Sequence, residues 1–200
     1  MKPTGWSDLE RALALRAPLR LDVEVSRKAA VALLFREGDG GLELLFIHRA
    51  EHPLDPWSGH MGFPGGRAEK DDPDLRETAI RETREEIGID LARSGCYLGS
   101  LDEMRAMSRM RALDLTITPY VFRLDQHHAH VLSAEVTSVH WVPLEDLLGP
   151  LYRGLLDVSH GGENLSFPCF RVQGKTIWGL TYRMFSNLQT LIEEGAVLRQ

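Results

Sequence analysis

The run GGRAEKDDPDLRETAIRETREEIGI, residues 65–89, decides the fold of this chain. It predicts a glycine-rich loop leading into a helix that stops at Gly88, because glycine accepts the left-handed conformation common at helix ends. The helix start has two candidates. Either Asp72 is the N-cap and the following proline takes the first helical position, or Asp74 pairs with Glu77. Both keep the glutamate-rich half of the run inside the helix.

This helix is expected to have two chemically different faces. At about 100° per residue, Ile80, Thr83 and Ile87 fall on one narrow side that can pack inward. Three carboxylates fall within an arc of roughly 100° on another side: Glu82, Glu85 and Glu86. They repel one another, and a hard divalent cation such as Mg²⁺ would relieve that repulsion. The alternative is a solvated helix with ion pairs such as Arg81 to Glu85.

The loop before the helix favours the cation. Phe63-Pro64-Gly65-Gly66 can bring backbone carbonyls and amides close to a metal or a phosphate. The segment RETREEIGI, residues 81–89, then resembles the second half of the Nudix box, G-x5-E-x7-R-E-U-x-E-E-x-G-U, where U is a bulky apolar residue. The spacing from Gly66 to Arg81 is one residue longer than this pattern. The isolated glutamate position of the box therefore falls on Asp72 when counted forward from Gly66, and on Pro73 when counted back from Arg81.

The lengthened box is similar to that of the coenzyme A pyrophosphatase branch of Nudix hydrolases. The resemblance implies an α/β (α+β) fold, the Nudix α/β/α sandwich with a central mixed β-sheet. We expect a helical extension over residues 1–28 and the Nudix domain over residues 29–200. The resemblance also implies Mg²⁺ or Mn²⁺ as cofactor. The implied metal ligands are Gly66, Glu82, Glu85 and Glu86. The implied catalytic residues are Arg81, Glu85, Glu86 and Glu135.

Residues 49–66 resemble the coenzyme A signature L-L-T-x-R-x4-R-x3-G-x3-F-P-G-G. Arg49 matches the first arginine, but no second arginine is present, and Pro53 and Leu54 stand near its place. Candidate substrate-binding residues are Arg49, His60, Arg67 and Arg109. A strand-end ion pair for Arg49 and a structural loop role for His60 stay open. We expect residues 102–112 to form an arginine-bearing loop that either meets a polyanionic substrate or is merely solvated.

Glu135 precedes a strand-like segment. Residues 135–144 resemble the E-V-x4-W-V-P-L segment of the same branch, where such a glutamate can be an extra metal ligand or general base. Capping of a strand entry is the alternative. The nearby histidines lie in a polar stretch without metal-type spacing, and we interpret them as an exposed turn: His127, His128 and His130.

Composition limits the remaining possibilities. The chain has 200 residues and a net charge of −6, so general nucleic-acid binding is not expected. Its two cysteines form no metal or disulfide pattern, which suits a reducing compartment such as the cytoplasm. No apolar run is long enough for a membrane span, and no signal-peptide pattern is seen. A helix over residues 7–17, with Ser7 and Glu10 as a capping box, is a packing or homodimer-forming appendage.

Further elements follow from local patterns. We expect strands over residues 29–35, 42–48, 96–101 and 115–122, a short helix over residues 144–148, a hairpin joining residues 167–172 to 176–178, and a last helix from about residue 180 to Glu194 that Gly195 closes. The predicted function is metal-dependent hydrolysis of a nucleoside diphosphate linked to another moiety. The favoured substrate is coenzyme A or an acyl derivative. ADP-ribose or another nucleotide sugar is one alternative, and a non-catalytic ligand-binding module is another.

Overall fold

The central element is the strand β1, and the whole sheet is assembled around it. The computed structural model describes residues 4–52, 57–108, 111–125, 127–160 and 163–197. The main sheet runs in the order β3-β2-β1-β7-β5, with β4 paired to β1, β6 to β7 and β8 to β2. Since β1 and β7 are parallel and the other pairs are antiparallel, the sheet is mixed, as expected. Its strands are β1 (Arg27–Gly38), β2 (Gly41–Arg49), β3 (Met61–Gly62), β4 (Gly65–Arg67), β5 (Gly95–Ser100), β6 (Met104–Ser108), β7 (Arg111–Leu124) and β8 (Val136–Pro143).

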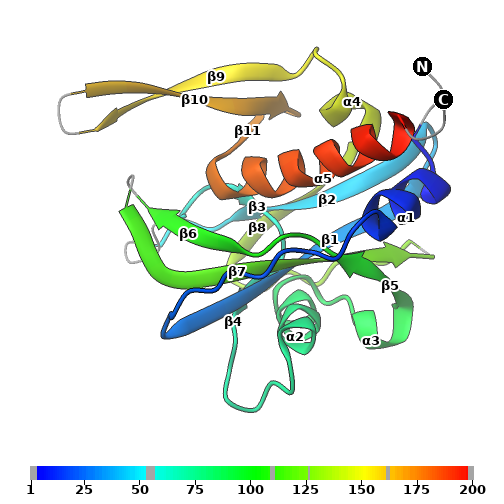
Figure 1. Cartoon of the computed structure of the whole chain (residues 1–200), viewed down its shortest axis with the longest axis horizontal. Coiled ribbons are helices and arrows are strands. Elements are labelled where there is room, and N and C mark those ends of the chain that lie inside the picture. The colour runs from blue at the N-terminus through cyan, green and yellow to red at the C-terminus, as the bar shows by residue number, and fades with distance from the viewer. Residues whose placement is uncertain (1–3, 53–56, 109–110, 126, 161–162, 198–200) are drawn as a thin grey trace.

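Helices cover both faces of this sheet (Figure 1). On one side lie α2 (Leu75–Ile87) and α3 (Leu91–Ser94), and on the other lie α1 (Trp6–Ala14), α4 (Leu144–Leu148) and α5 (Gly179–Val197). Successive residues of β1 enter opposite cores, because strand side chains alternate. Ala30 and Leu34 pack on the α2 side, while Leu33 and Phe35 pack on the α5 side. This explains the unbroken apolar run of β1 and confirms the predicted α/β/α sandwich.

A separate three-stranded sheet covers part of the α5 side. It consists of β9 (Arg153–His160), β10 (Glu163–Val172) and β11 (Lys175–Trp178), in the order β11-β10-β9. In Figure 1 this sheet lies at the top of the view, with α5 below it. The hairpin of β10 and β11 was expected. The partner strand β9 was missed, because its sequence alternates too weakly to indicate a strand.

Three local expectations were wrong. Residues 104–108 form β6 rather than a loop, since their backbone finds partners along β7 and Ala106 is buried. The first helix spans Trp6–Ala14 rather than residues 7–17: its N-cap is Gly5, two residues before Ser7, and the Asp8 side chain accepts the Gly5 N–H. The last helix does not end at Gly195, which is buried inside α5 and faces Ala12 of α1. The glycine there permits close helix packing instead of ending the helix.

Candidate active site

The helix α2 carries the acidic residues, and its two ends are well defined. The Asp74 side chain accepts the Glu77 N–H at 2.9 Å, so the second of the two candidate starts is the observed one. Gly88 ends the helix in the left-handed conformation, with φ of 75°. Between these ends Thr83 and Ile87 are buried against the sheet and Ile80 is half-buried. The apolar face is therefore placed as predicted, and the glutamates point toward the loop of β4.

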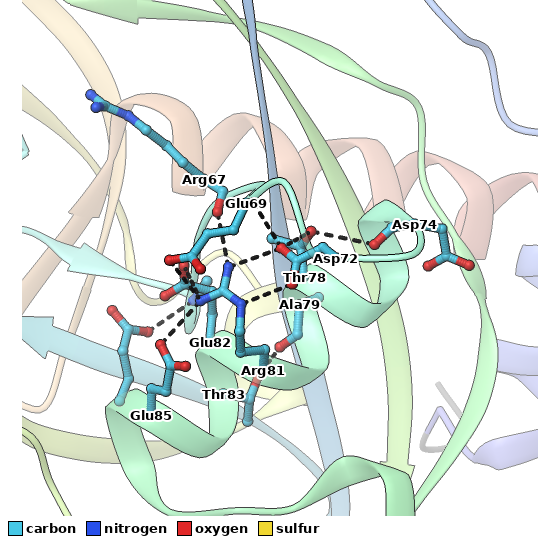
Figure 2. Close-up of polar contacts among 12 residues, drawn as sticks. Arg67, Glu69, Asp72, Asp74, Thr78, Ala79, Arg81, Glu82, Thr83 and Glu85 are labelled. Carbon is cyan, nitrogen blue, oxygen red and sulfur yellow. Dashed lines mark hydrogen bonds and ion pairs between the residues drawn. The ribbon is translucent and has the colours of Figure 1, made fainter.

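Arg81 is the centre of the polar contacts on this helix (Figure 2). Its guanidinium holds Asp72 with two hydrogen bonds, from Nε to Oδ1 at 2.9 Å and from Nη2 to Oδ2 at 3.0 Å. Nη1 reaches Glu82 Oε1 and Glu85 Oε2, each at 3.0 Å. Nη2 also donates to the Arg67 carbonyl at 3.0 Å. One side chain thus ties α2 to the preceding loop and to β4.

Asp72 is the acid that pairs with this arginine, which resolves the choice between residues 72 and 73. It also accepts the Glu69 N–H and the Thr78 hydroxyl, both at 2.9 Å, and its side chain is only 8% exposed. The hydrogen bonds from Arg81 hold the pKa of Asp72 well below its ordinary value, although burial opposes them. The same contact raises the pKa of Arg81. The pair is therefore held as a carboxylate and a guanidinium at neutral pH.

Glu86 lies deepest of the three glutamates. It is 3% exposed, its Oε2 accepts the Gly65 N–H at 2.8 Å, and its Oε1 lies 3.6 Å from Arg49 Nη1. Burial raises the pKa of Glu86 to about 7. The Gly65 N–H and Arg49 oppose this rise, whereas the negative charges of Glu82 and Glu135 add to it. Burial likewise raises the pKa of Glu82, with Arg81 opposing. Both carboxylates are therefore costly to keep ionised in this buried position.

The two glycines of β4 are required by close approach. Gly65 has φ of +151°, and a Cβ there would lie 2.3 Å from the Ala30 carbonyl oxygen. A Cβ on Gly66 would lie 2.4 Å from Glu82 Oε1. At Gly65 the obstacle is the backbone of β1, so no other residue type fits there, whereas a side chain at Gly66 would push the Glu82 carboxylate aside. The loop and the acidic face are therefore one structural unit.

Glu135 and Arg49 join this unit from a different part of the chain. The Glu135 carbonyl accepts the Ala50 N–H at 2.8 Å, which places the turn before β8 next to the end of β2. The Glu135 charge contributes to the raised pKa of both Glu82 and Glu86. The structure therefore brings together Gly66, Arg81, Glu82, Glu85, Glu86, Glu135 and Arg49.

The other predicted substrate-binding residues are more dispersed. His60 packs near Trp178, with ring centroids 5.0 Å apart. Figure 2 shows the Arg67 side chain directed away from the Arg81 cluster, to which it contributes only its carbonyl. Arg109 lies outside the described residues. Arg105 is exposed and donates from Nε to the Leu113 carbonyl at 3.0 Å, so it is part of the β6–β7 pair rather than of a loop.

A cavity of about 1060 Å³ adjoins the acidic unit. One end reaches Gly65, Gly66 and Glu135, and Arg49 and Arg67 line it as well. The other walls come from β6, the three-stranded sheet and the start of α5, and include Met107, Val158, Leu165, Phe167, Trp178, Leu180 and Met184. The sequence did not single out these distant wall residues, because no local pattern distinguishes them from core side chains.

The donor set suits a hard divalent cation. Carboxylate and carbonyl oxygens are its preferred ligands, and the narrow space between Gly66 and Glu82 brings a backbone strand against a carboxylate. Among the described residues no three acidic, histidine or cysteine side chains are placed to hold one ion together. Glu82 and Glu85 both contact Arg81 instead. For Glu82 and Glu85 to bind the same cation, both carboxylates must turn away from Arg81. Arg81 would still keep its hydrogen bonds to Asp72 and to the Arg67 carbonyl.

The histidine-rich stretch belongs to a different surface. His127 Nδ1 lies 3.1 Å from Arg36 Nη1, and Trp141 Nε1 donates to His130 Nε2 at 3.3 Å. Arg36 also stacks over Trp141, with its Cζ 4.0 Å from the ring centroid. These contacts fasten the segment before β8 against the hairpin of β1 and β2, as an interacting turn rather than a purely solvated one.

Comparison with known proteins agrees with this geometry. The family model of the NUDIX domain matches residues 25–159. Mitochondrial coenzyme A diphosphatase NUDT8 of Mus musculus is 30% identical over 188 residues, which cover 90% of this chain and 87% of NUDT8. Uncharacterized protein C14C4.10c of Schizosaccharomyces pombe is 39% identical over 110 residues, which cover 54% of this chain and only 33% of that protein.

A solved structure shows the same fold. The crystal structure of a C. elegans Ap4A hydrolase binary complex has a TM-score of 0.50 and 23% sequence identity, and it covers 61% of this chain and 83% of that chain. No described helix is both long and apolar enough to cross a membrane. The domain match spans more than half of the chain, and a relative of similar length shares 30% of its residues. This chain therefore belongs to the Nudix family of hydrolases, which act on diphosphate anhydrides.

Proposed function

We propose that this Nudix hydrolase cleaves the diphosphate bond of coenzyme A or an acyl derivative in a divalent-metal-dependent reaction. The observation that carries the proposal is the placement of the glutamates of α2 against Gly65 and Gly66 at one end of a cavity of about 1060 Å³. The similarity to NUDT8 along most of both chains supports coenzyme A as substrate. The resemblance of residues 49–66 to the coenzyme A signature supports it further.

Each residue of the acidic unit has a role in this proposal. Nudix hydrolases generally use divalent metals, and here Glu82, Glu85, Glu86 and the Gly66 carbonyl would hold Mg²⁺ or Mn²⁺. The bound ion supplies charge neutralisation for the diphosphate and lowers the pKa of water. Arg81 keeps α2 in register with β4 through Asp72 and the Arg67 carbonyl. Glu85, Glu86 and Glu135 are the candidates for the general base that accepts the proton of the attacking water.

The cationic side chains near the cavity would contact the substrate's phosphates. Arg49 lies beside Glu86 at the cavity wall, and Arg67 lines the cavity on the β4 side. Guanidinium groups bind phosphate oxygens through two parallel hydrogen bonds. His60 lies farther along the wall, near Trp178. The first helix was expected either to pack or to form a dimer, and here α1 packs against α5 of the same chain, with Leu9 and Ala12 buried. A cytoplasmic location and a homodimer stay part of the proposal.

One assay tests the substrate class. The protein is incubated with Mg²⁺ and coenzyme A, ADP-ribose or a dinucleoside polyphosphate, and monophosphate products are measured with and without a chelator. We expect coenzyme A to be cleaved with the highest kcat/KM and the chelator to abolish cleavage. A higher kcat/KM for ADP-ribose would replace coenzyme A by a nucleotide sugar. The absence of any turnover across the panel would favour a ligand-binding module.

A further inference from the structure

The far end of the cavity has a different chemistry from the acidic end. Val158 of β9 and Leu165 of β10 are cross-strand partners, and Phe167 lies two residues farther along the same face. All three are half-buried and line the cavity, together with Met107 of β6 and Leu180 of α5. Successive side chains of a strand point to opposite faces of the sheet, so the residues between these three point away from the cavity. Leu155, on that opposite face, is 60% exposed.

Part of the apolar end lies beyond the residues that the NUDIX family model matches. The NUDIX match ends at residue 159, whereas Leu165, Phe167 and Leu180 lie beyond it. The catalytic glutamates and glycines all lie within the match.

The position of this wall relative to the glutamates indicates what it binds. The same cavity is continuous from Gly66 and Glu135 to Leu165 and Phe167, so one ligand can occupy both ends. The side chains of Val158, Leu165 and Met107 are apolar, so a polar group placed against them would lose its hydration without gaining a hydrogen bond from these three. An alkyl chain would gain from the same burial. The wall therefore favours an apolar extension of a diphosphate substrate.

We propose that the β9–β10 hairpin and β6 form a binding site for the acyl chain of an acyl-coenzyme A, and that this site makes the enzyme selective for chain length. The proposal rests on the proposed coenzyme A diphosphatase function. It goes beyond that function because it assigns one region of the molecule to the thioester end of the substrate. Phe167 of β10 packs against Trp178 of β11, with ring centroids 5.7 Å apart, which holds the Phe167 side chain in place on the wall.

The test is a comparison of acetyl-, hexanoyl- and octanoyl-coenzyme A with free coenzyme A. A buried methylene contributes about 0.8 kcal/mol, close to fourfold in affinity, when it is fully removed from water. For a partly open wall we expect the KM of octanoyl-coenzyme A to be at least about tenfold below that of acetyl-coenzyme A. In Leu165→Asp this ratio should fall below about twofold, because a carboxylate then faces the chain.

The matched control is Leu155→Asp, which adds the same charge to the exposed face of the same hairpin. It should keep the wild-type ratio. Val158→Thr, a change of similar volume, is a milder second variant and should reduce the ratio in the same direction if Leu165→Asp does not fold. Folding is checked by circular dichroism and the thermal midpoint.

Other outcomes would overturn the proposal. Equal KM values for all chain lengths, with coenzyme A still cleaved, would remove the acyl site and leave the proposed function intact. An equal loss for free and acylated coenzyme A in Leu165→Asp would assign the wall to another part of the substrate, such as the nucleobase. If neither free nor acylated coenzyme A were cleaved, the proposed function and the acyl site would both fail.

Discussion

At the scale of single residues, Gly66 shows how closely β4 and α2 approach each other. A Cβ at this position would lie 2.4 Å from Glu82 Oε1 and 2.5 Å from its Cδ. Gly66→Ala should displace the Glu82 carboxylate, and a displacement near 1 Å at a reacting site costs about a hundredfold in rate. We expect kcat to fall by roughly that factor in the Mg²⁺-dependent assay.

The control for this change is Gly40→Ala in the turn between β1 and β2. A Cβ there meets nothing within 4 Å. Its activity should equal that of the wild type. Wild-type turnover in Gly66→Ala would show that the glycine is not required for catalysis.

The glutamates themselves give a second prediction at this scale. Glu86→Gln keeps an oxygen that can accept the Gly65 N–H but removes the negative charge that a cation needs. We expect kcat to fall by about a hundredfold or more, and the Mg²⁺ concentration for half-maximal activity to rise. Glu85→Gln should act in the same direction.

Glu77→Gln is the matched control, since Glu77 lies on the same helix but in its first turn, beside Arg76. It should leave both kcat and the Mg²⁺ requirement unchanged. Full turnover in Glu85→Gln and Glu86→Gln together would mean that these carboxylates do not hold the ion.

At the scale of elements, the position of α2 depends on the pair formed by Arg81 and Asp72. The Asp72 side chain is 8% exposed and the Arg81 side chain 16% exposed, so removal of either partner leaves a poorly hydrated charge. Such a loss costs about 3 kcal/mol of unfolding free energy. Lysine cannot replace Arg81, because a single ammonium cannot make both bonds to Asp72 and still reach Glu82 and Glu85.

A double-mutant cycle measures this coupling. In urea unfolding, Asp72→Asn and Arg81→Gln should each destabilise, and the double variant should cost less than their sum by about 1–3 kcal/mol. Arg76→Gln, whose side chain is 42% exposed and lies 3.7 Å from Glu77, should change stability by less than about 0.5 kcal/mol. Additive effects of the two buried substitutions would show that the pair does not act as a unit.

At the scale of the whole molecule, Asp102 joins segments that are distant in sequence. Arg16 Nη1 and Nη2 donate to its two oxygens, each at 2.7 Å, and the Leu19 N–H and the Asn187 amide donate as well. This carboxylate thus ties the chain after α1 to α5 and to the segment between β5 and β6. The hydrogen bond from Arg16 is the main reason that the pKa of Asp102 is lowered to about 2.

This pKa predicts a dependence of stability on pH. The folded pKa is depressed, so the contribution is fully present above the ordinary value of 3.8 and is lost as the pH falls through the folded pKa of about 2. Because Arg16 is 40% exposed, we reduce the full linkage value to about 1–2 kcal/mol. Asp102→Asn should therefore be less stable than wild type by that amount at pH 7, and the difference should shrink as the pH falls through about 2 and vanish below it.

Urea unfolding across this pH range measures the effect. Asp39→Asn, in the exposed turn between β1 and β2, removes the same charge without these contacts and serves as the control. A pH-independent difference between Asp102→Asn and wild type would assign the stabilisation to shape and hydrogen bonding rather than to charge.

The sequence by itself determined the local elements and the identity of the acidic helix. Periodicity and turn residues are local properties, so they predicted α2, its end at Gly88, the hairpin of β1 and β2, and the acidic face. They could not choose between Asp72 and Pro73 as the partner of Arg81, because that choice depends on how the loop before α2 folds back. They also placed Gly195 at a helix end, since its packing against α1 is not visible in the chain.

Only the tertiary structure decided which distant residues share the cavity. Glu135 comes next to Glu82 and Glu86 because the turn before β8 is hydrogen-bonded to the end of β2. Met107, Leu165 and Phe167 form one apolar wall because β6 pairs with β7 and the three-stranded sheet lies over α5. Contacts across many residues depend on strand pairing and packing, whereas a sequence pattern records only neighbours along the chain.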